Sequence, residues 1–153
     1  SSEMRTVRRL LAALHLFIGV GAVAGGLSAL LEPTGPMGMS TDALVNAPFE
    51  TFLVPGILLF GLIGLGNLAS AVPALASRRW AGYASGAMGC VLIGWIVVQC
   101  LMLADVVALH VIFFCLGAAQ GCLALALLAL EGLWPGTWAT RAVRSLRRGR
   151  GAR

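Results

Sequence analysis

Charge is the property that this chain has least of. Charged side chains make up 11% of its 153 residues, about half the share of an ordinary soluble domain. Lysine is missing altogether, so all 11 basic residues are arginines. Apolar residues make up 59% of the chain instead. An ordinary soluble domain is therefore not expected.

Groups that carry chemistry are equally scarce. The 2 histidines, His15 and His110, fall near opposite ends of a membrane-spanning arrangement, so they cannot hold one haem together. The sequence contains no nucleophile–base pair, P-loop, zinc motif or kinase signature. The 4 cysteines lie within apolar blocks and form no disulfide or metal pattern. We expect no enzymatic activity, no metal site and no cofactor.

The apolar residues are concentrated in four blocks, at 10–31, 52–76, 80–104 and 106–133. Each is longer than the roughly 20 residues that a helix needs to cross a bilayer. In lipid the backbone must satisfy its own hydrogen bonds, which favours helices over isolated strands. The first block follows the outline of a signal peptide, but its length favours a spanning helix. We predict an all-α membrane protein, an antiparallel four-transmembrane-helix bundle over 1–134 with a basic tail over 135–153.

The placement of charge predicts the orientation. Arginines occur at the N-terminus, in the second connection and in the tail, whereas the first and third connections carry only acidic charges. Basic residues in short connections stay in the cytoplasm. Both termini are therefore expected inside, with the first connection outside. The alanine, glycine and arginine bias is typical of a GC-rich bacterial genome, which indicates the bacterial inner membrane.

Two features are expected at the outer surface. Thr41 is placed to cap a short helix in the first connection, and Pro48 is placed to end it. Pro55 lies near the start of the second block, where it would bend the helix if it lay beyond the first turn.

Small residues recur at the spacing that lets membrane helices approach each other closely. The pairs lie four residues apart on the first, third and fourth blocks: Gly21 and Gly25, Gly82 and Gly86, and Gly117 and Gly121. They predict a compact bundle, and some of them are candidates to face a partner protein or a second copy.

The tail after Trp134 has the pattern of an amphipathic helix, with Thr137 as its cap. Trp138, Ala142 and Leu146 take one face. The other carries the arginines Arg141, Arg144, Arg147 and Arg148. We expect it to lie on anionic inner-leaflet lipid. A solvated basic tail that only enforces the topology is the alternative, and a nucleic-acid partner is not expected because no folded basic face is indicated.

Polar residues within the apolar blocks are the candidate site. An outer cluster is predicted at the loop side of the bundle, made of Glu50, Trp95, Gln99, Asp105 and His110. It is either a ligand or proton site or a set of structural caps. Deeper in the bundle, His15 and Asn67 have similar depth and are expected to form a structural contact. Gln120 is the single polar residue near mid-membrane in its block, and it is expected to be an interhelical contact rather than a site.

The segments PFETFLVPGILLFGLIGLGNL and GWIVVQ resemble those of small uncharacterised bacterial membrane proteins with four spanning helices. The similarity covers residues 48 to about 120. It implies the four-helix architecture and no particular activity.

Two functions from different classes follow from these patterns. The first is a non-enzymatic accessory or assembly subunit, or a self-associating bundle, that binds another membrane protein or lipid. The alternative is a component of a small-solute or proton transporter or channel, acting as an oligomer through the outer cluster. An enzyme that uses His110 as a base ranks last.

The predicted orientation can be tested by cysteine labelling in intact cells. Gly38→Cys and Ser77→Cys are made one at a time, with the native cysteines replaced. A membrane-impermeant thiol reagent should label position 38 in intact cells and position 77 only after the membrane is opened. The opposite pattern would reverse the topology.

Overall fold

The computed structural model describes residues 1–152 and shows a helical protein; Arg153, the end of the predicted tail, lies outside them. Four helices in the described part are long and apolar enough to cross a membrane: Ser2–Leu31, Leu53–Leu75, Ala81–Leu103 and Ala108–Leu130. The second is built from α2 (Leu53–Ile57), the π-helical η3 (Leu58–Leu65) and α3 (Gly66–Leu75), and the others are α1, α4 and α5. The prediction of four apolar spans is confirmed.

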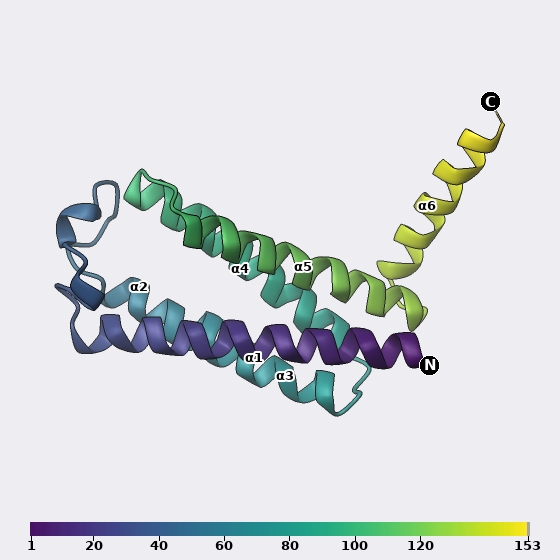
Figure 1. Ribbon diagram of the computed structural model, residues 1–153, viewed down its shortest axis with the longest axis horizontal. Coiled ribbons are helices and arrows are strands. Elements are labelled where there is room, and N and C mark those ends of the chain that lie inside the picture. The colour runs from purple at the N-terminus through teal and green to yellow at the C-terminus, as the bar shows by residue number, and fades with distance from the viewer. Residues whose placement is uncertain (153) are drawn as a thin grey trace.

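The spans run antiparallel and form two pairs (Figure 1). α1 packs along η3 and α3, α4 packs along α5, and the pairs meet where α1 contacts α5 and α3 contacts α4. The start of α1 and the end of α5 lie together at what we call the termini end of the bundle. The connection after α1 and the turn between α4 and α5 lie at the opposite, loop end.

The first helix is longer than its apolar block, since it begins at Ser2 rather than near residue 10. The Ser1 side chain accepts a hydrogen bond from the Met4 amide at 3.2 Å, which caps the helix start. Arginine, methionine and leucine all favour helices, so the charged segment continues the helix without a break. Arg8 is therefore held on α1 itself and not on a flexible leader.

The second span has no bend at Pro55, and the expected condition for one is not met. Pro55 is the third residue of α2, in the first turn, where its missing N–H has no helical partner in any case. The helix instead widens into a π-helix over Leu58–Leu65. Long π-helical segments are rare and occur most often at functional sites.

Glycines allow the close packing, but only some of the predicted ones take part. An added Cβ at Gly82 would lie 2.7 Å from Leu128, yet at Gly121 it would meet nothing within 4 Å. An added Cβ would make only ordinary contacts at three other predicted glycines, Gly21, Gly25 and Gly86. At Gly117 it would make a tight contact. The closest approach between α1 and η3 is at Gly26, where a Cβ would lie 2.5 Å from the Phe60 nitrogen. Gly121 nevertheless lies close to α4 through its backbone, because a Cβ added at Gly89 would lie 2.9 Å from the Gly121 nitrogen.

The connection at the loop end contains two single turns, η1 (Pro36–Gly38) and η2 (Thr41–Ala43). Ser40, rather than Thr41, caps the second turn by accepting from the Asp42 amide. Asn46 then bonds twice to the end of α4, through its amide to the Met102 carbonyl at 3.0 Å and through its side chain to the Leu101 carbonyl at 3.2 Å. The connection is thus fixed to the loop end of α4.

The basic tail forms α6 (Gly136–Gly151), which projects away from the bundle (Figure 1). It begins at Gly136 without a side-chain cap, so Thr137 does not play the predicted role. Tyr83 of α4 donates a hydrogen bond to the Trp134 carbonyl at 2.6 Å and fixes the link before the helix. Trp138 and Leu146 are exposed on α6.

Candidate functional site

Four polar side chains, one from each span, meet inside the bundle. His15 comes from α1, Asn67 from α3, Ser85 from α4 and Gln120 from α5, and each has 0% exposure. The predicted contact between His15 and Asn67 is confirmed, with 2.8 Å between His15 Nδ1 and Asn67 Oδ1. The expected interhelical contact of Gln120 is also confirmed, because its amide nitrogen lies 2.8 Å from Asn67 Oδ1. We call these four residues the polar centre.

The protons of the polar centre can be assigned from one bond. The Asn67 side-chain nitrogen donates to the Ile63 carbonyl at 2.8 Å, so Asn67 Oδ1 is the atom that faces the other groups. That oxygen can only accept. Gln120 Nε2 and His15 Nδ1–H therefore both donate to it, each at 2.8 Å.

The same assignment defines the ring tautomer of His15. With its proton on Nδ1, the neutral ring has a lone pair on Nε2, which lies 2.8 Å from Ser85 Oγ. The Ser85 hydroxyl donates to it. The 3.1 Å separation between Gln120 Nε2 and His15 Nδ1 is then a contact between two donors and contributes no hydrogen bond.

One acceptor in the polar centre is left over. Gln120 Oε1 is buried and has no hydrogen-bond partner among the described residues. Exchanging the oxygen and nitrogen of this amide would place an oxygen against Asn67 Oδ1, so the orientation is fixed by the network. Buried polar groups are nearly always paired, and an unpaired one marks a place where a further group can bind.

Apolar layers close the polar centre on both sides. Towards the termini end, Leu11, Ala81 and Leu127 have 0% exposure and form one cluster. Towards the loop end, a second cluster contains Ile18 and Leu92. The polar centre is therefore separated from both ends of the bundle by packed hydrocarbon.

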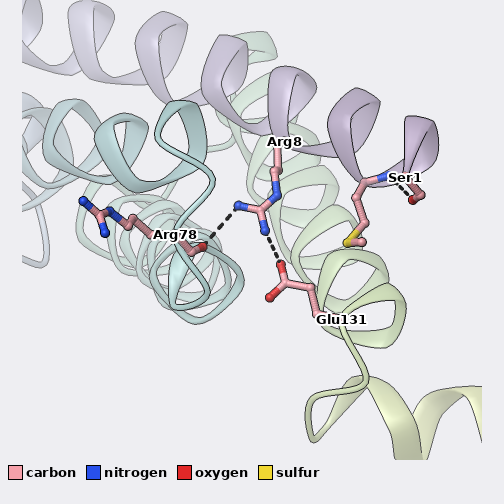
Figure 2. A network of polar contacts seen from close by, with 5 residues as sticks. Ser1, Arg8, Arg78 and Glu131 are labelled. Atoms are coloured by element: carbon pink, nitrogen blue, oxygen red, sulfur yellow. Dashed lines mark hydrogen bonds and ion pairs between the residues drawn. The ribbon is translucent and has the colours of Figure 1, made fainter.

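A charged contact covers the apolar layer at the termini end (Figure 2). Arg8 Nη2 lies 3.0 Å from Glu131 Oε1, and Arg8 Nη1 donates to the Arg78 carbonyl at 3.2 Å. The Arg8 and Glu131 side chains are 13% and 6% exposed. Glu131 Oε2 is buried without a partner among the described residues. This contact joins α1, the connection between α3 and α4, and the end of α5.

The charged contact and the polar centre occupy the same helix faces. Arg8 and His15 are seven residues apart on α1, and Gln120 and Glu131 are eleven apart on α5. Both spacings are close to whole numbers of turns, which gives a rise of about 10 Å and about 16 Å. The bundle therefore holds two polar layers that are separated by the apolar layer of Leu11.

The outer cluster predicted from the sequence is dispersed in the structure. Glu50 is exposed in the connection after α1, and Trp95 is 9% exposed within the apolar core. Gln99 is half-buried and makes no side-chain hydrogen bond within residues 1–152. Within residues 1–152, no side-chain hydrogen bond joins any of these three residues to Asp105 or His110.

Asp105 and His110 act locally, at the turn between α4 and α5. Asp105 Oδ1 accepts from the Val106 amide at 2.8 Å. His110 Nδ1 accepts from the Val107 amide at 3.2 Å and caps the start of α5. Both line one shallow apolar groove, but each has a structural role of its own. In the part of the chain that the structure describes, no three His, Cys, Asp or Glu side chains are grouped to hold a metal.

No protein family, curated protein or solved structure matches this chain in comparisons with known proteins. The function is therefore inferred from the geometry of the polar centre and of the bundle surface.

The hydrogen-bond network predicts how much each of three substitutions should lower the free energy of unfolding. Asn67→Leu removes three hydrogen bonds and leaves His15 and Gln120 without their shared acceptor. At about 0.6 kcal/mol for each bond within a membrane, the expected loss is roughly 2 kcal/mol. Gln120→Leu removes one bond and an unpaired oxygen, so its cost should be about 0.6 kcal/mol or less. Gln99→Leu, the matched control, should be neutral.

Unfolding of the purified protein in lipid bicelles measures these differences. Equal losses for Asn67→Leu and Gln99→Leu would mean that the bonds of the polar centre do not stabilise the folded bundle.

Proposed function

We propose that the chain is a multi-pass protein of the bacterial cytoplasmic membrane, with both termini in the cytoplasm. The support is electrostatic. The arginines of α1, of the connection between α3 and α4, and of α6 all belong to the termini end. The connections at the loop end carry acidic residues only. This asymmetry is typical of a cytoplasmic termini end.

We further propose that α6 lies on the inner leaflet. Its arginines Arg141, Arg144, Arg147 and Arg148 would neutralise anionic headgroups, while Trp138 and Leu146 enter the interface. Both apolar side chains are exposed in the isolated chain, at 64% and 71%. A lipid surface would cover them.

The proposed role is binding rather than catalysis: the protein is an assembly subunit that associates with a second copy of itself or with another membrane protein. The observation that supports this role is a row of small residues on the outward face of α5: Cys115, Ala119, Cys122 and Ala126. Three of them are exposed and Ala119 is half-buried. Their steps of four, three and four residues place them on one helix face.

Contact with lipid alone does not require small side chains, because large apolar side chains contact lipid equally well. Between helices they have a clear role, since they let two backbones approach and gain van der Waals contact. The inward face of α5 already contacts α4 through other residues, including Gly117 and Ala124. The outward row is therefore free for a partner helix, and a two-fold dimer would place identical residues at the same depth.

Cross-linking through single cysteines tests this contact. In native membranes, proteins that keep only Cys115 or only Cys122 should cross-link to a species of twice the mass. The matched control is Val20→Cys in a cysteine-free background, which is exposed on α1 at a depth similar to that of Cys115. It should remain monomeric. Ala126→Trp should reduce the yield at Cys122, because a large side chain separates the two helices.

Two outcomes would count against the α5 contact. Equal cross-linking at Cys122 and at position 20 would indicate random collision. Cross-linking at Cys90 alone would move the contact to α4, where Ala87, Cys90 and Gly94 form a shorter small-residue row.

A second candidate function is a proton or small-solute transporter component that acts as an oligomer. The polar centre favours it, because polar groups buried in a membrane often mark an ion or proton pathway. The support therefore comes from the inner network and not from the outer residues that the sequence singled out.

Flux through reconstituted liposomes tests the second candidate. Wild-type protein should dissipate a pH gradient or carry a solute faster than His15→Asn protein at equal density. Background flux for both proteins, across a panel of ions and small solutes, would reject transport and leave the assembly role.

A further inference from the structure

One atom of the polar centre, His15 Nε2, can accept a further proton. In the assigned tautomer, His15 Nδ1 already donates to Asn67, whereas Nε2 is a bare lone pair that accepts from Ser85 Oγ at 2.8 Å. A hydroxyl group accepts as readily as it donates. The contact at Nε2 can therefore reverse its direction without any movement of a heavy atom.

We propose that the polar centre is an intramembrane proton-binding site, with His15 Nε2 as the atom that takes the proton. In net terms a hydronium ion of the surrounding water gives its proton to the Nε2 lone pair, a new N–H bond forms, and water is left. Because packed hydrocarbon closes the polar centre, this exchange requires a transient opening of the bundle. The new N–H donates to Ser85 Oγ. The Ser85 hydroxyl then turns to the carbonyl of Ala81, four residues earlier, which is the usual acceptor for a serine within a helix.

Two oxygen atoms around the ring would accept hydrogen bonds from its charged form. Burial away from water opposes a charged ring. Asn67 Oδ1 and Ser85 Oγ offset this by accepting from the two ring N–H groups, and hydrogen bonds from a charged donor are about twice as strong as neutral ones. Gln120 does not add to this effect, because the atom that lies 3.1 Å from Nδ1 is its amide nitrogen, the positive end of the amide dipole.

No like charge competes at the ring. The groups that face it are Asn67 from α3, Ser85 from α4 and Gln120 from α5, and all are neutral. The nearest arginines along α1 are Arg9, whose side chain is exposed, and Arg8, which is two turns away and paired with Glu131. The polar centre thus accepts a proton as a site of its own.

All four groups come from one chain, so the site does not depend on self-association. It is also separate from transport, because a proton can bind without crossing the membrane. Loss of the dimer leaves the site in place. A bound proton without flux would reject the transporter candidate and keep the site.

Nitrogen NMR of the full chain in lipid bilayers tests the proposal. Histidine is labelled with ¹⁵N in the ring, and His110→Gln leaves one labelled ring, with the unsubstituted chain as a check that the His15 signals are unchanged. At about pH 8 the Nδ1 signal should be that of a protonated nitrogen and the Nε2 signal that of a bare one. At about pH 5 both should be protonated, with the helical content unchanged.

Three results would overturn the proposal. One is a proton on Nε2 rather than Nδ1 at about pH 8, which would contradict the assigned network. Another is an Nε2 that stays bare down to about pH 4 while the chain remains folded, which would make the polar centre purely structural. The third is protonation that occurs only together with loss of helical structure, because the site would then not exist in the folded bundle.

Two serine variants give a matched comparison. Ser85→Ala removes the acceptor for the new N–H, so the protonated fraction at a given acidic pH should fall about tenfold or more. Ser70→Ala is the control, because the Ser70 hydroxyl donates to the Gly66 carbonyl and does not contact the ring. Its protonated fraction should match that of the unsubstituted chain. An equal change in both variants would reject the role of Ser85 and, with it, the site at Nε2.

Discussion

The buried polar centre depends on one hydrogen bond, from the Asn67 side-chain amide to the Ile63 carbonyl. The bond lies where the π-helical segment ends and α3 begins, and it gives the Ile63 carbonyl a second donor beside the Gly66 amide. It also turns Asn67 Oδ1 towards the other helices, where it accepts from His15 and Gln120. One local irregularity of the backbone thereby determines the donor and acceptor pattern of the whole site.

The bundle alternates polar and apolar layers along its length. The charged contact of Arg8 and Glu131 at the termini end is followed by the layer of Leu11 and Leu127, then by the polar centre. Apolar side chains give little preference for one register in lipid, because lipid tails are as apolar as the side chains themselves. Polar layers do give such a preference, since each buried group needs a partner at its own depth. The two layers together define how α1 and α5 align.

The coarse architecture followed from composition, and the close contacts did not. The four spans and the contact between His15 and Asn67 were predicted, because hydropathy and depth along a helix can be counted from the sequence. Ser85 was missed, because a serine in an apolar helix usually bonds to its own backbone. The contact between Arg8 and Glu131 was missed because it needs the first helix to begin at Ser2, within a segment that resembles a charged leader.

The sequence by itself determined that this chain forms four long apolar helices joined by one longer and two short connections. The reason is that a continuous apolar segment in lipid satisfies its backbone hydrogen bonds within itself only as a helix. Tertiary structure alone decided which polar residues meet and which glycines are used. Gln120 joins the network while Gln99 makes no side-chain hydrogen bond within residues 1–152, and Gly26 packs tightly against Phe60 while a Cβ at Gly21 would make only an ordinary contact. These outcomes depend on the rotation of each helix about its own axis, which hydropathy does not specify.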